Sequence, residues 1–237
     1  MAPQNQLSWK LHEYKELSST NDFALNYANT ADERHIFIAQ TQSNGRGRRG
    51  RHWISPIGNL YFSQLFFTSC PPNKLVYISA ISVVQTLLAK LPQLLGRIAV
   101  KWPNDIMLDG KKLGGILIEK NASDNTVIGI GLNLVSAPPA DLVSYPATSL
   151  SDIGLALAGI DFLHSYISFF DRNLQRDFTA VRCEFLNFAW QLNSDITISL
   201  DNKNVSGRFI GIDEQGFLLL QQEQVILTIN TGEILFS

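Results

Sequence analysis

The first half of the chain alternates short apolar runs with polar turns, a pattern that indicates β-strands with few helices. Strands are predicted at 9–17, 36–42 and 58–67. The polar segment 18–22 precedes the apolar residues 23–27 and predicts a short helix. Helix capping and ligand contact are equally good explanations of the polar side chains in 18–22. This part of the chain is expected to form a sheet interrupted by one short helix.

The middle of the chain predicts a buried helix followed by a β-hairpin. The apolar stretch 75–95 is interrupted by polar residues and a proline, so it predicts a buried helix and not a membrane span. Asp109-Gly110 is a two-residue turn signal, and it places Lys112 on the hairpin strand 111–119. Gly114-Gly115 weakens this strand, a defect that commonly marks close approach of a ligand or of another backbone.

The next predicted strand, 127–134, carries Gly129 and Gly131 and ends with the polar Asn133. A bulged antiparallel partner is a credible explanation of the two glycines. It does not explain a polar residue at an otherwise apolar strand end, so Asn133 needs a separate explanation.

The last part of the chain changes from a helical pattern to short strands. Residues 161–190 repeat apolar and aromatic side chains at helical spacing, which indicates a core-facing helix rather than a cofactor site. Strands separated by polar turns are predicted at 196–200, 205–212, 217–222 and 225–229. Such closely spaced strands indicate a small barrel. We therefore divide the chain into a main domain, 1–191, and a C-terminal barrel, 192–237.

Composition narrows the class of protein. The chain has 237 residues, of which 45% are apolar, and a formal net charge of −2, which suits a soluble enzyme and argues against general nucleic-acid affinity. Cys70 and Cys183 give neither a metal-binding spacing nor a disulfide framework, so a reducing cytoplasm is expected. No export signal or membrane span is expected, and the four scattered histidines lack the spacing of a metal site.

One segment departs from this nearly neutral composition. The arginine loop, Gly45-Arg46-Gly47-Arg48-Arg49-Gly50-Arg51, holds four of the 19 Lys and Arg residues. Arginine presents a planar fork of donors that fits phosphate or carboxylate oxygens, and glycine lets the backbone come close to a ligand. The loop is therefore predicted to close over an anion. A solvated surface loop and an RNA-binding Arg-Gly segment are the alternatives.

The same segment matches the Gly-x-Gly-x-x-Gly pattern of dinucleotide-binding sites. That pattern requires a helix directly after it. Here the segment 53–58 follows, and Pro56 ends any helix at once. A Rossmann nucleotide site is therefore not expected, and the loop must hold its anion by side chains as well as by backbone.

Five motifs in this order resemble the biotin protein ligases, also named biotin–[acetyl-CoA-carboxylase] ligases. They are Ser19-Thr20-Asn21, Gln42 to Arg51, Lys101-Trp102-Pro103-Asn104-Asp105, Lys112 to Glu119 and Gly129 to Asn133. The resemblance runs from about Leu17 to the C-terminus. It implies an α+β fold with a mixed, mainly antiparallel sheet and helices packed on one side, similar to class II aminoacyl-tRNA synthetases, plus a small C-terminal SH3-like β-barrel.

The resemblance implies a two-step reaction that uses ATP. The carboxylate of biotin attacks the α-phosphorus of ATP and gives biotinyl-5'-AMP and pyrophosphate; the amine of a carrier-protein lysine then displaces AMP. The implied ligands are biotin, ATP and Mg²⁺, and the implied partner is an apo biotin carboxyl carrier protein. Such an enzyme needs positioning and charge stabilisation rather than a nucleophile of its own. A homodimer is also possible.

The resemblance also assigns roles to individual residues. Biotin contacts are implied for Ser19, Thr20, Asn21, Gln42, Gly45, Arg46, Gly47, Arg48, Lys112 and Gly115. ATP and adenylate contacts are implied for Arg48, Arg51, Trp53, Asn104, Asp105, Lys112 and Asn133. Lys112 and Arg48 are the expected catalytic residues, because their charges would offset charge growing at the α-phosphorus. Asp105 is the candidate Mg²⁺ ligand.

The chain departs from the family in two places. Bifunctional members carry an N-terminal winged helix, whereas about eight residues precede the first predicted strand here, so sequence-specific DNA binding is not expected. Thr231 stands where the family often has glycine. The alternatives are a lipoate ligase or octanoyltransferase, which would not be expected to carry the arginine loop, and a non-catalytic RNA-binding module, which leaves Lys112 and Gly114-Gly115 unexplained.

Overall fold

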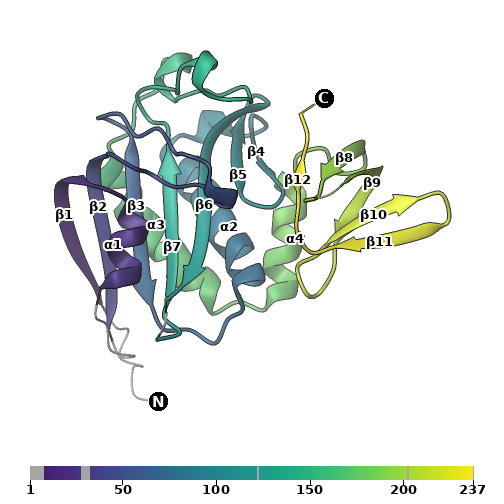
Figure 1. The fold of residues 1–237 in the computed structure, drawn as a ribbon, viewed down its shortest axis with the longest axis horizontal. Coiled ribbons are helices and arrows are strands. Elements are labelled where there is room, and N and C mark those ends of the chain that lie inside the picture. The colour runs from purple at the N-terminus through teal and green to yellow at the C-terminus, as the bar shows by residue number, and fades with distance from the viewer. Residues whose placement is uncertain (1–7, 28–32, 122, 202, 237) are drawn as a thin grey trace.

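The computed structural model describes residues 8–27, 33–121, 123–201 and 203–236. Its larger part is a seven-stranded sheet in the order β1-β2-β3-β7-β6-β5-β4 (Figure 1). The strands are β1 (Trp9–Leu17), β2 (Arg34–Gln42), β3 (Leu60–Phe66), β4 (Ile98–Lys101), β5 (Asp105–Leu108), β6 (Lys111–Lys120) and β7 (Thr126–Leu132). The β1–β2 pair is parallel and the other five pairs are antiparallel, so the sheet is mixed and mainly antiparallel, as predicted.

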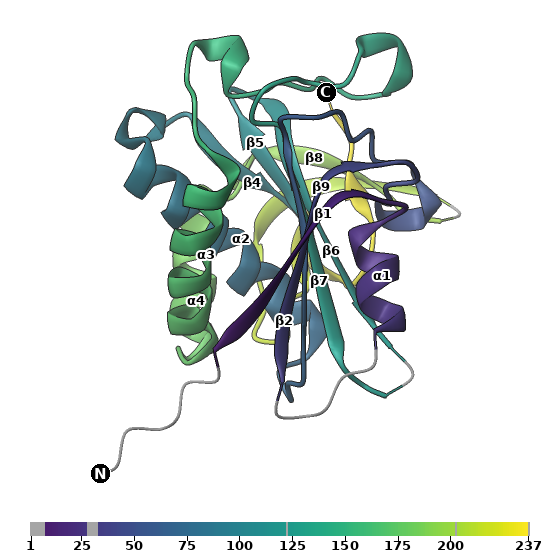
Figure 2. The same ribbon diagram turned by 90° about the vertical axis from the view of Figure 1, so that its left-hand side faces the viewer.

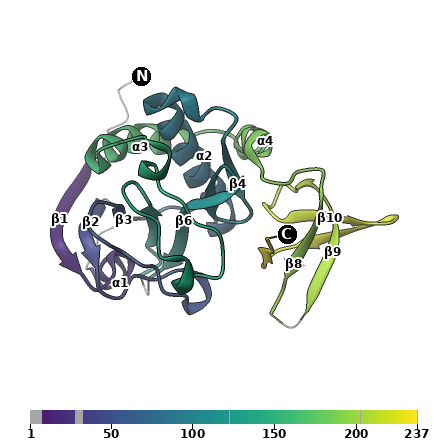
Figure 3. The same cartoon turned by 90° about the horizontal axis from the view of Figure 1, so that it is seen from above.

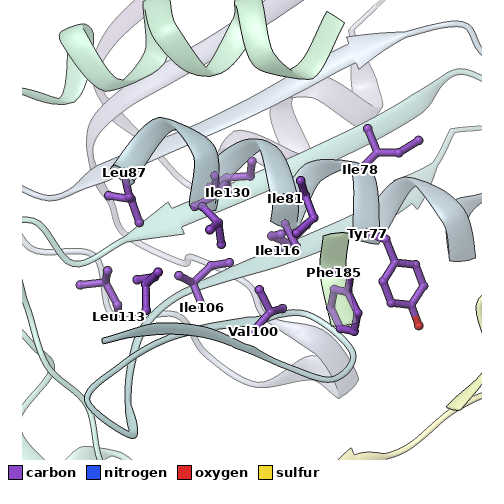
Figure 4. Close-up of a cluster of buried hydrophobic side chains, with 14 of the residues drawn as sticks. Tyr77, Ile78, Ile81, Leu87, Val100, Ile106, Leu113, Ile116, Ile130 and Phe185 are labelled. Atoms are coloured by element: carbon purple, nitrogen blue, oxygen red, sulfur yellow. The ribbon is translucent and has the colours of Figure 1, made fainter. Parts of the chain in front are cut away.

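Three helices cover one face of this sheet: α2 (Pro72–Lys90), α3 (Gly159–Leu174) and α4 (Phe178–Phe188) (Figure 2). The main core lies between α2 and the strands. Figure 4 shows part of it, with Tyr77, Ile78, Ile81 and Leu87 of α2 beside Val100, Ile106, Leu113, Ile116 and Ile130 of the strands and Phe185 of α4. In the part of the chain that the structure describes, no helix is long and apolar enough to cross a membrane.

The three long helices pack on one side of the sheet, as predicted, whereas the short helix α1 (Thr20–Asn26) lies on the opposite face (Figure 2). Ala24 of α1 packs with Phe37, Leu65 and Val127 in a second, smaller apolar cluster. Strand β3 is buried along its whole length, so both faces of the sheet need a cover. Helix α1 provides that cover on the second face.

The helical apolar period predicted at 161–190 corresponds to two helices. Helix α3 ends at Leu174, and α4 begins after Asp177, whose side chain accepts a hydrogen bond of 2.7 Å from the backbone N–H of Thr179. An N-capping aspartate stabilises the start of a new helix, which explains the break. The aromatic residues still form part of the core, as predicted, and Tyr166 is fully buried.

The C-terminal part is a five-stranded antiparallel sheet in the order β11-β10-β9-β8-β12 (Figures 1 and 3). Its strands are β8 (Asp195–Ser199), β9 (Asn204–Ile212), β10 (Leu218–Gln222), β11 (Val225–Ile229) and β12 (Glu233–Ile234). The first four were predicted. The short β12 was not, because two residues carry no readable alternation; the pairing with β8 defines it. Figure 3 shows this sheet beside the main domain, next to α4 and β4.

Candidate active site

A cavity of about 350 Å³ lies on the face of the large sheet that carries α1. Its walls come from the start of α1, the arginine loop, β5, β6, β7 and the segment 142–145. The predicted site residues that line it are Ser19, Thr20, Asn21, Gln42, Arg46, Gly47, Arg48, Arg51, Trp53, Asn104, Asp105, Lys112 and Gly115. The structure thus brings side chains that are up to about 96 positions apart in the sequence to one cavity.

One end of the cavity is a buried hydrogen-bond network. The hydroxyl of Ser63 donates to Oγ1 of Thr20 at 2.8 Å and to Oδ1 of Asn21 at 2.6 Å. The backbone N–H of Thr20 donates to Oε1 of Gln42 at 2.8 Å. Ser19 caps α1 by accepting from the backbone N–H of Asp22 at 3.3 Å. Capping therefore explains Ser19, while the other side chains form a fixed set of donors and acceptors beside the cavity.

Glycines in β6 and β7 let two side chains approach the sheet closely. A Cβ atom at Gly129 would overlap Oδ1 of Asn21, and one at Gly131 would lie 2.6 Å from the indole of Trp53. Strand β7 pairs with β3 and β6 in continuous register, so the bulge explanation of these glycines is wrong. Close approach of Asn21 and Trp53 explains them instead.

The arginine loop is closed over the cavity, and its ends are fixed by ion pairs. Arg46 lies 2.6 Å from Asp22 and 2.8 Å from Glu119, which joins it to α1 and β6. The backbone turns back at Arg49, where φ is 57°, so that the N–H of Gly47 donates to the carbonyl of Arg51 at 2.7 Å. This turn directs neighbouring arginine side chains to different partners.

The remaining arginines of the loop reach the C-terminal sheet. Arg51 forms a two-pronged contact with Glu233, at 2.9 and 3.1 Å, and Arg49 lies 3.0 Å from Asp201. Arg48 donates to Oδ1 of Asn104 at 3.1 Å and weakly to a carbonyl of the C-terminal sheet at 3.4 Å. Burial lowers the pKa of Arg48 somewhat from its ordinary high value, although nearby Asp105 opposes this. Arg48 is still a fixed positive charge at the cavity.

Lys112 is a largely buried cation of the cavity that lies beside a carboxylate and two aromatic rings. It follows the β5–β6 turn, where Asp109 and Gly110 have φ of 49° and 74°, which confirms the predicted hairpin. Its side chain is largely buried, and Nζ lies 2.7 Å from Oδ1 of Asp105. The rings of Trp53 and Tyr145 flank the ammonium at 5.4 and 4.8 Å. A carboxylate and two aromatic faces thereby keep this charge at one position.

A model of the biotin/lipoate A/B protein ligase family matches residues 14–133, and a model of the biotin protein ligase C terminal domain matches residues 192–237. Biotin–[acetyl-CoA-carboxylase] ligase of Paracoccus denitrificans is 32% identical over 92% of this chain and 97% of its own length. The chain belongs to the biotin protein ligase family. The bifunctional ligase/repressor BirA of Escherichia coli is 31% identical, and the match covers 92% of this chain and 71% of that protein.

Solved structures of the biotin protein ligase family have the same fold. The biotin protein ligase from Aquifex aeolicus in complex with biotin and ATP gives a TM-score of 0.83 at 27% identity, covering 94% of this chain and 97% of that one. The Leishmania major biotin protein ligase in complex with biotinyl-5-AMP gives 0.70 at 25% identity, covering 96% and 98%. The predicted family and fold class, including the SH3-like C-terminal part, are confirmed.

Two predicted site residues lie outside the main cavity of this biotin ligase. The Nδ2 group of Asn133 donates to the carbonyl of Thr148 at 3.1 Å, and Asn133 lines a smaller adjacent cavity together with Lys112 and Tyr145. Gly45 is the first residue of the loop, and an added Cβ there would be 2.5 Å from the carbonyl of Trp53. Their predicted ligand contacts stay predictions, and in the structure the carbonyl of Gly45 accepts a hydrogen bond from the backbone N–H of Trp53, which does line the cavity.

Several acidic and aromatic residues of the site were not predicted. Asp22, Glu119, Asp201 and Glu233 pair with the arginine loop, and Tyr145 flanks Lys112. The sequence did contain one signal, because four arginines in a loop that packs against protein need nearby carboxylates. It gave no means of choosing which carboxylates, since none is adjacent in the chain.

Asp105, the predicted Mg²⁺ ligand, lies beside two lysines. Its carboxylate lies 2.7 Å from Nζ of Lys112 and 3.9 Å from Nζ of Lys101, so the nearest charges are positive. Among the residues that the structure describes, no group of three or more His, Cys, Asp or Glu side chains converges. Asp105 pairs with Lys112 in this structure, and its role as a Mg²⁺ ligand stays a prediction.

Proposed function

We propose that the chain activates biotin with ATP and transfers the biotinyl group to one lysine of a biotin carboxyl carrier protein. This proposal rests on one observation: the same cavity holds a buried polar network and a cluster of cations. The polar network includes Thr20 and Asn21, and the cations are Lys112 and the arginines of the loop. A ligand with a small polar head and a carboxylate that must meet a phosphate matches this distribution.

The polar end suits the ureido ring of biotin. The hydroxyl and amide groups of Thr20, Asn21 and Gln42 offer both donors and acceptors, and their positions are already fixed by bonds to each other and to Ser63. The apolar residues Ile116, Leu117 and Ile130 line the same cavity and suit the thioether ring and alkyl chain. This arrangement would direct the biotin carboxylate towards Lys112.

The cationic end suits the first chemical step. An oxygen of the biotin carboxylate forms a bond to the α-phosphorus of ATP, while the bond to the bridging oxygen breaks and pyrophosphate leaves. Lys112 and Arg48 would offset the charge that develops on the phosphoryl oxygens, and Asp105 would keep the Lys112 ammonium in place. Trp53, which lies against Gly131 of β7 and lines the cavity, would contact the nucleotide.

The second step forms the amide. The amine of the carrier lysine attacks the carbonyl carbon of biotinyl-5'-AMP, a C–N bond forms, the C–O bond to AMP breaks, and the amine loses a proton. The closed arginine loop would keep water away from the mixed anhydride until the carrier arrives. Neither step requires a covalent bond to this chain.

The test is transfer of labelled biotin to an apo biotin-carrier domain in the presence of ATP and Mg²⁺. The expected result is labelling of one carrier lysine that depends on ATP and disappears when this lysine is replaced by arginine. Labelled lipoic acid is the matched control for the lipoate ligase alternative. Labelling with lipoate but not with biotin, or no biotin binding at all, would contradict the proposal.

Some finer features remain part of the proposal. Both cysteines, Cys70 and Cys183, are free thiols, which supports action in a reducing cytoplasm. We also propose the domain bounds 1–191 and 192–237, supported by the C-terminal family match at 192–237. Homodimer formation and the lack of sequence-specific DNA binding stay predictions; sedimentation with and without ligands and a DNA-binding titration would test them.

A further inference from the structure

Lys101, at the end of β4, is a buried lysine that does not line the cavity. Its side chain is 1% exposed, and Nζ lies 3.9 Å from Oδ2 of Asp105 and 3.7 Å from Oε1 of Glu233. The ring of Phe236 lies 3.9 Å below the ammonium. Both carboxylates are beyond hydrogen-bond distance, so the ammonium acts on them through its charge. Lys101 therefore faces one carboxylate of the main sheet and one of the C-terminal sheet.

The two carboxylates extend this contact into a row of alternating charges. Arg51 of the loop contacts Glu233 at 2.9 Å, and Asp105 contacts Lys112 at 2.7 Å. In order along the row, the charges are Arg51 (+), Glu233 (−), Lys101 (+), Asp105 (−) and Lys112 (+). Both end members line the cavity, whereas the middle member lies behind it. Figure 1 shows β12, which carries Glu233, on the side of the C-terminal sheet that faces β4 and β5.

The charge of Lys101 cannot be explained as a device for stability. Burial lowers the pKa of Lys101 from its ordinary value, and Asp105 and Glu233 only partly offset this effect. A lysine whose pKa is lowered on folding carries its charge at a cost to the folded state. Replacing all members of a buried ion-paired group with apolar residues is often neutral or stabilising, although removing only one member leaves an uncompensated charge. A different reason for keeping the charge is therefore needed.

The position of Lys101 between Asp105 and Glu233 explains why its charge is kept. Without the ammonium of Lys101, Asp105 and Glu233 would face each other as like charges across an apolar gap, and each would move towards its remaining cation. Such a movement would displace Lys112 and Arg51 in the cavity. A displacement of about 1 Å at a reacting centre can cost a large factor in rate.

We propose that Lys101 is a positioning residue that sets the places of Lys112 and Arg51 through Asp105 and Glu233, and so couples the C-terminal sheet to the first chemical step. This inference rests on the proposed function, because the step concerned is formation of the adenylate. Lys101 touches neither biotin nor ATP; it acts through the two carboxylates.

The test compares Lys101→Met with Lys120→Met. The control carries the same substitution at an exposed lysine that pairs with Asp124 on the surface, at the far end of β6. For Lys101→Met, assayed well below its Tm, we expect kcat for biotin-dependent pyrophosphate exchange to fall at least about tenfold, with an unchanged Kd for biotin. The Tm should fall modestly, because Asp105 and Glu233 lose the cation between them. Lys120→Met should match the wild type in all three measurements.

The outcomes separate this inference from the function on which it rests. If the wild type shows no biotin-dependent exchange and no carrier labelling, the proposed function fails. If the wild type is active and Lys101→Met keeps its kcat, or loses kcat only as far as it loses Tm, the positioning role is wrong. Should Lys101→Met fail to fold, Glu233→Gln replaces it: the same fall in kcat at unchanged biotin Kd is expected, and normal kcat would overturn the proposal.

Discussion

At the scale of single residues, the glycines of β7 decide which side chains reach the floor of the cavity. Gly129 makes room for Asn21, and Gly131 makes room for the indole of Trp53. The two positions lie on the same strand but serve opposite ends of the proposed ligand. They offer a way to disturb biotin and nucleotide contacts separately without changing a charge.

Gly129→Ala is expected to weaken biotin binding by roughly tenfold or more, because its methyl group displaces Asn21 from the hydroxyl of Ser63 and leaves buried polar groups unpaired. Gly131→Ala is the matched variant; its methyl group displaces Trp53, so it should weaken ATP binding more than biotin binding. Calorimetric titration of each variant with each ligand measures this. If both variants lost biotin affinity and ATP affinity equally, the assignment of Asn21 to biotin and of Trp53 to ATP would be wrong.

At the scale of elements, the arginine loop is held closed by contacts to three separate parts of the fold. Arg46 pairs with Glu119 on β6, Arg49 with Asp201 and Arg51 with Glu233. These pairs are partly exposed to solvent, so each contributes little and is weakened by salt. The loop is thus closed but easily opened, which suits a cover that must admit biotin and ATP.

Hydrogen exchange should detect how readily the arginine loop opens in the free protein and whether ligands order it. The amides of Gly47, Arg51 and Trp53 close hydrogen bonds within the loop, and we expect their exchange to slow when biotin and ATP bind. At about 1 M salt, where charges are screened within about 3 Å, the same amides should exchange faster in the free protein. Amides of β3 serve as the control. Identical exchange rates of the loop amides in the free protein, in the ligand-bound protein and at high salt would rule out a loop that is ordered by ligands.

The elements themselves were largely predictable from apolar periodicity. Strand β1 and the β5–β6 hairpin were predicted because alternation and turn residues are local signals. The break between α3 and α4 was missed because apolar spacing continues across Asp177, so the capping signal was hidden. The side of the sheet that α1 covers was also missed. Helix α1 covers the face of β3 and β7 that the longer helices leave open. The position of those longer helices is a property of the tertiary fold and cannot be read from local sequence.

At the scale of the whole molecule, the site depends on contacts between distant parts of the chain. Motif residues such as Lys112 and Gln42 could be predicted because their family resemblance is local and ordered along the sequence. Glu233 could not be predicted, since its partners Arg51 and Lys101 lie in different elements of the main domain. The sequence predicts which residues carry the chemistry, whereas the structure is needed to find the residues that hold them.

The contact between the C-terminal sheet and the arginine loop should depend on pH. Burial raises the pKa of Glu233, but its hydrogen bond and ion pair with Arg51 outweigh burial, so the pKa is lowered overall. The ionised carboxylate therefore stabilises the fold above its unfolded pKa of about 4.3, and this contribution is lost as pH falls through the lower folded pKa.

Urea unfolding of the wild type and Glu233→Gln measures this dependence. The wild type should be the more stable of the two at pH 7, and the difference should shrink below about pH 4 as the carboxylate takes up a proton. Glu223→Gln, at an exposed carboxylate of the β10–β11 turn, is the control and should show no such trend. A difference that is the same at both pH values would mean that the charge of Glu233 is not its source.

The central claim is that the cavity around Lys112 forms an adenylate from biotin and ATP, and biotin-dependent exchange of labelled pyrophosphate into ATP tests it most directly. We expect the wild type to catalyse exchange only when biotin is present. Lys112→Ala should fold normally and lose the exchange by about 100-fold or more, because it removes the cation that we propose to offset charge at the α-phosphate, whereas Lys111→Ala at the exposed neighbouring position should be unaffected. Normal exchange by Lys112→Ala, or exchange by the wild type without biotin, would contradict the account.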